Sequence, residues 1–364
     1  MDLIPLFDTQ AMLKPLREQL QHAAGRVIQS GDYILGPEVQ AFEKDWAAYC
    51  GTKYAVGVAN GTDALELALR SVGVKAGDDV IVPSLTFYAT AEAVASIGAN
   101  PVFCDVDPHT GCINKDTVQA VLTNNTAAII PVHLFGNPAP MKQLAELGIP
   151  LIEDAAQSAG SQLDGSPAGS FGVAASFSFF PSKNLGAAGD GGAVVANDPA
   201  IAEQLTMLRF HGSLDRQTHQ LIGYNSRLDE IHAAMLRVML PHLDQWTSQR
   251  KQASEFYAQA GINQWVTPMK PTPGSEPAWH LYVVRHPQAD QLVHHLKLQG
   301  IESRGYYRTP VHLQPAMRPW LPSYELPGTM ELASTNLALP FGPWLTQEHA
   351  EQVVAALSTA DLTA

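Results

Sequence analysis

Two stretches that each end in a charged residue, Ile149-Pro150-Leu151-Ile152-Glu153-Asp154 and Ser176-Phe177-Ser178-Phe179-Phe180-Pro181-Ser182-Lys183, decide which fold the chain is expected to adopt. Each contains an apolar run typical of a buried strand. Successive residues of a strand face opposite sides, so only one of Glu153 and Asp154 can point into a given pocket. The sequence therefore predicts an acid and a lysine at the ends of consecutive strands.

An acid and a lysine placed in this way are what pyridoxal phosphate chemistry requires. A lysine amine holds the aldehyde of this cofactor as a Schiff base, and burial makes the amine more nucleophilic because it lowers the pKa. A carboxylate keeps the pyridine nitrogen protonated, so that the ring acts as an electron sink. Each residue alone has an ordinary alternative. Asp154 could cap a following helix, and Lys183 could be a surface residue at the start of a loop.

Outward from these stretches, short apolar runs alternate with helical patterns over the first two thirds of the chain. Strands are expected over residues 55–59, 79–82, 101–104, 127–132 and 150–152, and helices over residues 63–72, 89–97, 115–122 and 140–147. This alternation predicts a mainly parallel sheet with helices on both faces. Parallel strands bring their carboxyl ends to one side of the sheet, where ligands bind.

The pattern changes after residue 173. Strands are expected over 173–180 and 193–196 with no helix between them, and Pro241 should break or kink a long helical stretch over 229–250. A strand over 281–285, helices over 290–299 and 347–357, and a proline-rich loop over 309–327 follow. The expected fold class is therefore α/β, with a large α/β/α domain over residues 1–242 and a smaller α+β domain over residues 243–364.

Three further segments combine residues suited to binding a phosphate or a flat ring. In Asn60-Gly61-Thr62-Asp63 a strand passes directly into a helix, whose first N–H groups attract a phosphate. Phe87 or Tyr88 could give a cofactor ring an aromatic face to lie against. Asn225 and Arg227 suit an oxyanion or a phosphate. Helix caps and ordinary packing explain the same residues equally well when each segment is taken alone.

The amino-acid composition argues against several classes of protein. With 46% hydrophobic and 16% charged residues, the 364-residue chain can bury a sizeable core. A net charge of −13 argues against a nucleic-acid-binding surface. We expect no membrane span, because no run of 18 apolar residues occurs, and no signal peptide, because the start lacks a basic region before an apolar one. Cys50, Cys104 and Cys112 have no metal-binding spacing and suit a cytoplasmic protein without disulfides or metal.

Taken together, these segments resemble the DegT/DnrJ/EryC1/StrS family of nucleotide-sugar aminotransferases, over nearly the whole chain from residue 31 to residue 341. The resemblance implies fold type I architecture and pyridoxal 5′-phosphate as the cofactor. Lys183 would bind the cofactor and move the proton, and Asp154 would pair with the pyridine nitrogen. The other cofactor contacts that the resemblance implies are Gln157 to the ring hydroxyl, Phe87 against the ring, and Gly61, Thr62, Asp63 and Ser178 to the phosphate.

The resemblance also implies a homodimer with shared active sites. Asn225 of each subunit would act on the phosphate held by the other subunit, with Arg227 in the same shared site. The segment that ends in Tyr306-Tyr307-Arg308-Thr309-Pro310-Val311-His312 resembles the sugar-nucleotide loop of the family, so Tyr306, Tyr307 and His312 are implied substrate contacts. The family usually has a His-Tyr pair where this chain has Tyr306-Tyr307, and often a proline in place of Arg308.

Residues 223–234 most resemble enzymes that aminate dTDP-linked 3-keto-6-deoxyhexoses, with L-glutamate as the amino donor by analogy. Three alternatives stay open. The first is a 4-keto sugar aminotransferase of the same family. The second is a sugar 3-dehydratase, which Lys183 argues against because those relatives have a histidine there. The third is a non-catalytic regulator that retains the fold, which would be expected to have lost part of the cofactor-binding set.

Overall fold

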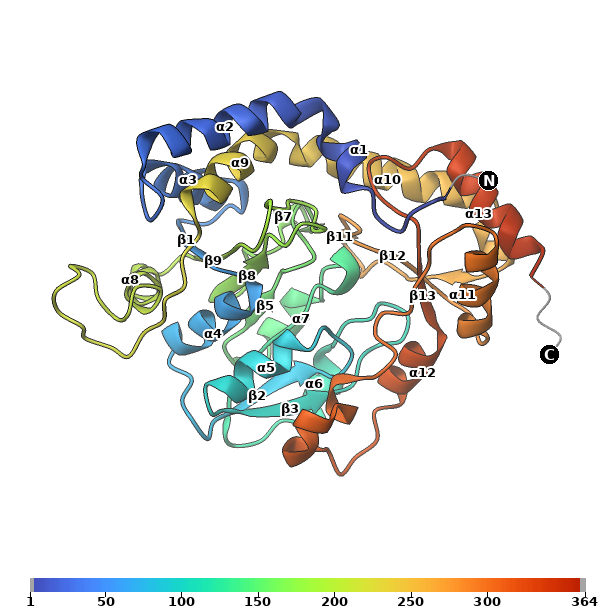
Figure 1. Cartoon of the computed structure of the whole chain (residues 1–364). Coiled ribbons are helices and arrows are strands. Elements are labelled where there is room, and N and C mark those ends of the chain that lie inside the picture. The colour runs from blue at the N-terminus through green and yellow to red at the C-terminus, as the bar shows by residue number, and fades with distance from the viewer. Residues whose placement is uncertain (1–2, 361–364) are drawn as a thin grey trace.

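The computed structural model describes residues 3–360, and a central mixed β-sheet organises them (Figure 1). Its strands are β1 (Tyr54–Val58), β2 (Asp79–Pro83), β3 (Asn100–Cys104), β4 (Thr126–Ile129), β5 (Ile152–Asp154), β8 (Ala174–Ser178) and β9 (Gly192–Ala196). A sheet of order β3-β2-β4 meets a sheet of order β1-β9-β8-β5 through parallel bridges that pair Ile129 with Leu151 and Val132 with Asp154. Within these two sheets only β9 runs antiparallel to its neighbours, so the sheet is mostly parallel as expected.

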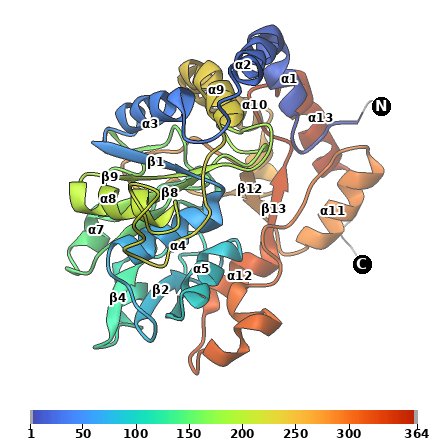
Figure 2. The same cartoon turned by 60° about the vertical axis from the view of Figure 1, so that its left-hand side comes forward.

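Alternating apolar side chains build a core on each face of this sheet. Val80 and Val82 of β2 pack into one core with α4, α5 and α8, whereas Ile81 packs on the opposite side with α6 and α7. Phe177 of β8 packs beneath α3 and α9. The helices that cover the two faces are α3 (Pro37–Tyr49), α4 (Gly61–Ser71), α5 (Ala89–Ser96), α6 (Lys115–Gln119), α7 (Met141–Ala145), α8 (Pro199–Leu208) and α9 (Glu230–Met239). Figure 2 shows the sheet between these layers.

The N-terminal residues contribute helices that the sequence did not predict. Helices α1 (Thr9–Leu13) and α2 (Arg17–Ser30) are separated by the 3₁₀ turn η1 (Lys14–Leu16), and α2 packs along α9. Pro241 lies in the 3₁₀ turn η3 (Leu240–His242), which separates α9 from α10 (Leu243–Gln259). The break expected at this proline is confirmed, and the helical stretch continues nine residues beyond the predicted end at residue 250.

A second core lies in the C-terminal part. The antiparallel sheet β10-β12-β13 is covered by α10, α11 (Ala289–Leu298) and α13 (Gln347–Ser358). Its strands are β10 (Thr267–Pro268), β12 (Tyr282–Arg285) and β13 (Asn336–Leu339), and helix α12 (Pro327–Thr335) precedes β13. A small sheet joins β11 (Ser275–Glu276), β6 (Gln162–Leu163) and β7 (Ser166–Pro167).

Two segments cross the division predicted at residue 242. Ile4 packs in the C-terminal core and bridges Ile301, although it belongs to the N-terminal segment. The expected proline-rich loop contains the 3₁₀ turns η5 (Val311–Leu313) and η6 (Pro315–Trp320), and its Met317 packs in the core of the large sheet. The boundary itself stays a prediction. None of the described helices is long and apolar enough to cross a lipid bilayer.

Candidate active site

A pocket of about 570 Å³ lies at the carboxyl ends of β1, β2, β5 and β8. This is the edge at which a mostly parallel sheet binds ligands. The pocket brings together most of the site residues predicted from the sequence: Gly61, Thr62, Asp63, Phe87, Asp154, Gln157, Ser178, Lys183, Tyr306 and Tyr307. They come from five separate segments of the chain, and folding places them around one cavity.

Lys183 and Asp154 line this pocket together. Lys183 follows β8 in a turn that its own backbone N–H closes on the carbonyl of Phe180, at 2.8 Å. Burial lowers the pKa of Lys183 to about 8, and the nearby Asp154 carboxylate opposes that shift. Burial raises the pKa of Asp154, and a hydroxyl, a backbone N–H and Lys183 counteract the rise. The amine is therefore closer to its neutral, nucleophilic form at neutral pH than a surface lysine.

Two donors fix the Asp154 carboxylate. The Thr90 hydroxyl donates to Oδ2 at 2.8 Å, and the backbone N–H of Ala156 donates to Oδ1 at 3.2 Å. No helix follows Asp154. The chain makes a turn there, so the helix-capping alternative does not apply, and the same turn brings Gln157 to the pocket.

Glu153 lies apart from the pocket in a buried network. Its carboxylate accepts hydrogen bonds from the backbone N–H groups of Gly169, Phe171 and Gly172, at 2.6–2.8 Å. It also bonds to Nε2 of His133 at 2.8 Å. The Nδ1 atom of His133 accepts from a backbone N–H, so Nε2 carries a proton and donates to Glu153. The network anchors β5 beside the pocket.

The beginning of α4 has the geometry of a phosphate site. Asn60 caps the helix by accepting from the backbone N–H of Asp63 at 2.8 Å. Among the described residues no hydrogen bond uses the backbone N–H of Gly61 or of Thr62. A Cβ on Gly61 would come within 2.7 Å of the Ser178 Cβ, so only glycine lets the helix start lie this close to β8. Two free N–H groups and the Ser178 hydroxyl thus surround one corner of the pocket.

Aromatic and amide groups form another part of the pocket lining. Phe87 is 57% exposed, and the centroid of its ring lies 6.0 Å from that of Tyr307. Gln157 donates from Nε2 to the Tyr307 hydroxyl at 3.2 Å, and its Oε1 accepts from the backbone N–H of Phe135 at 2.6 Å. The exposed Phe87 face leaves room for a flat ring beside it, which fits the expected cofactor.

Three predicted residues lie away from this pocket. Asn225 is exposed and pairs through its backbone with Phe210, and the Arg227 guanidinium lies 5.4 Å from the centre of the Phe210 ring. His312 is buried, and its Nδ1 is hydrogen-bonded to the Ser84 hydroxyl. Within a single described chain, none of these three contributes to the lining of the Lys183 pocket.

Sequence reasoning missed several residues of the pocket, including Phe7, Thr86, Thr90 and His280. Thr86 and Thr90 flank Phe87 at a spacing of four residues, which would place them on one side of a helix start, and this was the available signal. His280 directly precedes the strand expected over residues 281–285 and gave no signal. Its Nδ1 has no hydrogen-bond partner among the described residues, and burial keeps its pKa well below the usual value.

Known proteins resemble this chain in sequence and in fold over nearly its whole length. The model of the DegT/DnrJ/EryC1/StrS aminotransferase family matches residues 15–358. A dTDP-3-amino-3,4,6-trideoxy-alpha-D-glucose transaminase of Streptomyces venezuelae is 44% identical over 97% of this chain and 95% of its own. A pleiotropic regulatory protein of Geobacillus stearothermophilus is 40% identical over 98% of both chains. The crystal structure of S. venezuelae DesV in complex with a ketimine intermediate superposes with a TM-score of 0.94, at 42% identity over 98% of both chains. The fold class expected from the sequence is thereby confirmed.

Proposed function

Because the chain belongs to the DegT/DnrJ/EryC1/StrS aminotransferase family, we propose that it transfers an amino group from L-glutamate to a nucleotide-linked keto sugar. The family uses pyridoxal 5′-phosphate. The observation that carries the proposal is the placement of Lys183 and Asp154 in one pocket, beside a helix start with free N–H groups. Together these supply an amine, an anion and a phosphate site, which are the three groups that this cofactor requires.

Each pocket residue has a role in this proposal. The N–H groups of Gly61 and Thr62 and the Ser178 hydroxyl bind the cofactor phosphate, with Asp63 in the same helix turn. The remaining cofactor contacts are Asp154 to the pyridine N–H, Gln157 to the ring hydroxyl, and Phe87 against the ring face. When bound, the cofactor would accept the electrons of the bond that breaks at the carbon next to the amino nitrogen. Lys183 Nζ would hold the cofactor through its aldehyde and, once the amine is free, would move the proton at the α-carbon of the donor.

The sugar is assigned by likeness to a relative. The S. venezuelae transaminase is named for a 3-amino sugar linked to dTDP. We therefore propose a dTDP-linked 3-keto-6-deoxyhexose as the amino acceptor, and a 4-keto sugar as the alternative. Tyr306 and Tyr307 line the pocket and are proposed contacts to the sugar. Arg308 binds the carbonyls of Ala333 and Asn336 and the Asp290 carboxylate, so it is held outside the pocket.

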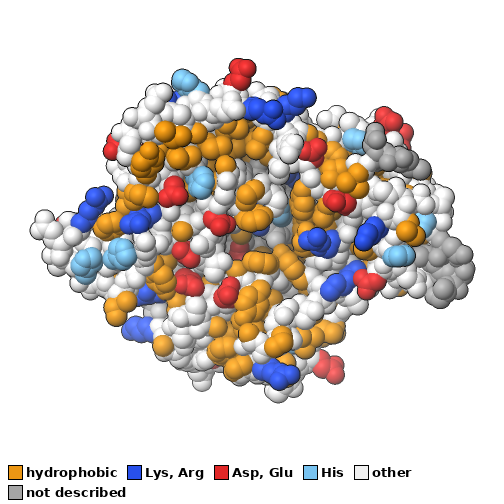
Figure 3. Space-filling model, viewed as in Figure 1, with side chains coloured by type: hydrophobic (Ala, Val, Ile, Leu, Met, Phe, Trp, Pro, Cys, Tyr) orange, Lys and Arg blue, Asp and Glu red, His pale blue; other side chains and the backbone are white. Residues whose placement is uncertain are grey.

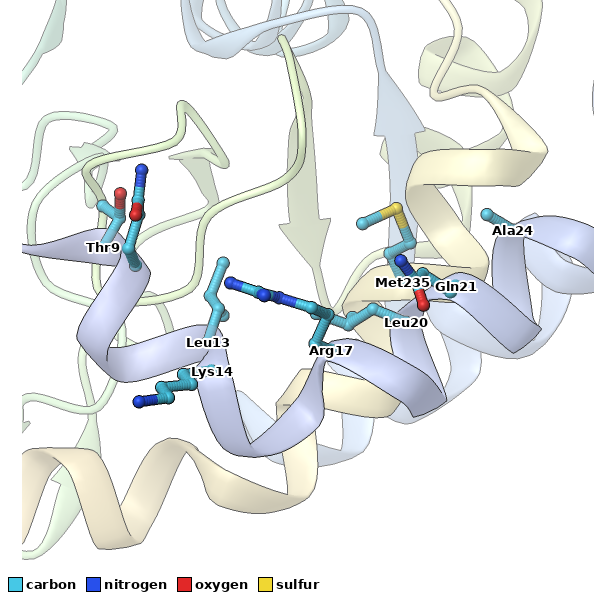
Figure 4. A pocket seen from close by; sticks show the side chains of 9 residues that line it. Thr9, Leu13, Lys14, Arg17, Leu20, Gln21, Ala24 and Met235 are labelled. Atoms are coloured by element: carbon cyan, nitrogen blue, oxygen red, sulfur yellow. The ribbon is translucent and has the colours of Figure 1, made fainter.

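We propose a homodimer in which each pocket is completed by the partner. Asn225 and Arg227 lie outside the pocket of their own chain, in a segment where Ile222 is 86% exposed. Figure 3 shows apolar side chains gathered over α2 and α9. A groove of about 340 Å³ continues this surface, with Leu13, Leu20 and Met235 among its lining residues (Figure 4). A second copy of the chain would cover these apolar groups.

A regulatory role is the second candidate, because one relative is named a pleiotropic regulatory protein. A regulator that had lost activity would not need the predicted cofactor contacts that this pocket brings together. The two roles are separated by assaying turnover directly.

We also propose that the enzyme works in a reducing compartment such as the cytoplasm. Cys50, Cys104 and Cys112 are all buried and unpaired. Burial raises the pKa of the Cys104 and Cys112 thiols to about 12, which keeps both in the thiol form.

The function is tested by loading the purified protein with pyridoxal phosphate and recording its visible spectrum before and after L-glutamate. We expect a yellow absorbance band that bleaches with glutamate, and no such band in Lys183→Ala. A panel of 3-keto and 4-keto sugar nucleotides then identifies the acceptor by mass spectrometry of the product. A protein that stays colourless with the cofactor would refute the proposal and favour the regulatory role. Amination of only 4-keto sugars would overturn the C3 assignment.

A further inference from the structure

Two buried threonine hydroxyls form a series of hydrogen bonds that ends at the Asp154 carboxylate. Thr86 Oγ1 lies 2.9 Å from Thr90 Oγ1, and Thr90 Oγ1 donates to Asp154 Oδ2 at 2.8 Å. Thr86 is 2% exposed and Thr90 is 1% exposed, whereas Phe87 between them is 57% exposed. The segment that presents an aromatic ring to the pocket thus also brings one hydroxyl, that of Thr90, to the strand-end carboxylate, with the Thr86 hydroxyl behind it.

The direction of donation along these hydrogen bonds follows from counting protons. A threonine hydroxyl has one proton, and an ionised carboxylate can only accept. Thr90 uses its proton on Asp154, so the proton between the two threonines belongs to Thr86. The order Thr86 to Thr90 to Asp154 therefore applies when Asp154 is ionised. Hydrogen bonds in such a series polarise one another, so the second hydroxyl strengthens the first.

Apart from Thr90, the Asp154 carboxylate has one other hydrogen-bond donor among the described residues. The Ala156 N–H at 3.2 Å is the longer of its two hydrogen bonds. Burial opposes its ionisation, and the Thr90 hydroxyl is the foremost group counteracting that effect. The charge of Lys183 acts in the same direction. An acid that must stay anionic to hold a pyridine N–H needs such a donor, because an unpaired buried carboxylate takes up a proton instead.

We propose that Thr90 is a positioning residue for cofactor binding: its hydroxyl holds Asp154 ionised and oriented toward the pocket, and Thr86 holds Thr90. This inference rests on the proposed function, since it requires a cofactor with a pyridine nitrogen. Neither threonine is assigned a contact with substrate. Their effect on the cofactor is transmitted through the carboxylate.

The experiment compares Thr90→Val, Thr90→Ser and Thr86→Val with the wild type. Valine keeps the shape and removes the hydroxyl, and serine keeps the hydroxyl. The matched control is Thr329→Val, because Thr329 is also buried and its hydroxyl has no partner among the described residues. Two quantities are measured: the dissociation constant of pyridoxal phosphate, and the nitrogen-15 chemical shift of bound cofactor labelled at the pyridine nitrogen. The second reports directly whether that nitrogen is protonated.

We expect Thr90→Val to weaken cofactor binding about tenfold, the size of one charge-assisted hydrogen bond, and to move the nitrogen-15 signal toward unprotonated pyridine. Thr86→Val should move the signal less and in the same direction, while Thr90→Ser and Thr329→Val should leave it unchanged. A purely structural role would weaken binding without moving the signal, and that result would overturn the inference.

Two other outcomes are also decisive. If Thr90→Val fails to fold, Thr86→Val decides, and a wild-type signal in that variant overturns the inference. If the wild type binds no pyridoxal phosphate, the proposed function falls and this inference falls with it. A wild type that binds the cofactor beside a Thr90→Val variant with unchanged affinity and signal refutes only the role of Thr90.

Discussion

Glu153 and Asp154 are adjacent on β5, yet their carboxylates serve different parts of the molecule. Glu153 is fully buried and accepts four hydrogen bonds, three of them from the 169–172 loop, whereas Asp154 faces the pocket that contains Lys183. The two-residue repeat of a strand separates them. One acid therefore stabilises the fold, and the other is free for a ligand.

The stabilising role of Glu153 is tested by Glu153→Gln. A glutamine has an NH₂ group in place of one carboxylate oxygen, and each oxygen of Glu153 now accepts from at least one backbone N–H. One donor would then face another inside the core. We expect the free energy of unfolding to fall by about 2–4 kcal/mol in urea denaturation. Glu146→Gln, which alters a mostly exposed ion pair with Lys115, should change it by less than about 1 kcal/mol.

Unlike Glu153→Gln, Asp154→Asn is not expected to destabilise the protein when no cofactor is bound. Burial raises the folded-state pKa of Asp154, so its protonated form stabilises the fold and that contribution is lost as pH rises through the folded pKa. At pH 7 the free energy of unfolding of the variant should therefore equal that of the wild type or exceed it by up to about 1 kcal/mol. It should nevertheless bind pyridoxal phosphate at least about tenfold more weakly. A large loss of stability would show that Asp154 has a structural role instead.

Lys183 should be unusually reactive near neutral pH. Its pKa of about 8 predicts half-maximal acetylation by acetic anhydride near that pH, measured by mass spectrometry of the peptide. In Asp154→Asn the midpoint should move lower, because the carboxylate that favours the charged amine is gone. A midpoint that stays at the ordinary lysine value would contradict the buried placement.

The same pKa of Lys183 predicts a pH dependence of stability. Because the folded-state pKa is lowered, the contribution of Lys183 is fully present above the ordinary lysine value and is lost as pH falls toward about 8. The unloaded wild type should therefore gain stability relative to Lys183→Met as pH rises from about 8 to 10. Parallel urea titrations of the two proteins check this, and equal slopes would count against it.

Gly61 should be intolerant of a side chain. In Gly61→Ala the new Cβ would meet the Ser178 Cβ at 2.7 Å, which must push the start of α4 away from β8. We expect cofactor affinity to fall about tenfold or more, since the phosphate site depends on that approach. The control is Gly25→Ala in α2, where nothing lies within 4 Å of the added atom. That change should raise stability by about 0.5–1 kcal/mol in thermal unfolding and leave cofactor binding unchanged.

Shared active sites are tested by mixing two inactive variants. Lys183→Ala removes the amine of one pocket, and Asn225→Ala combined with Arg227→Ala removes the groups proposed to reach the partner pocket. A mixed dimer then contains one pocket with all of these residues intact. Random reassociation should restore about one quarter of the wild-type activity, because half of the dimers are mixed and each has one working site. A mixture that remains inactive would show that the three residues do not act across the interface.

Several features of the site were predictable because they depend on local order. The strand ends at Asp154 and before Lys183, the helix start at Gly61 and the aromatic Phe87 all follow from apolar runs and the residues next to them. Asn225 and Arg227 were proposed as an anion site from their side chains, and their place in a shared site, like the role of His312, was drawn from the family resemblance. A single chain does not bring these three residues to the pocket. The Asp154 partner Thr90 was missed because it lies 64 residues away in sequence and meets the acid only across the sheet.

The sequence by itself determined the alternation of strands and helices, and with it the edge of the sheet at which an acid, a lysine and a helix start gather. Hydrophobic periodicity and the two faces of a strand are local properties, so they can be recognised in the amino-acid sequence alone. Only the tertiary structure decided which side chains complete that site. Burial of Lys183, the hydroxyl chain from Thr86 to Asp154, and the close approach of Gly61 to Ser178 all arise between segments far apart in the chain, where distance and desolvation set the chemistry.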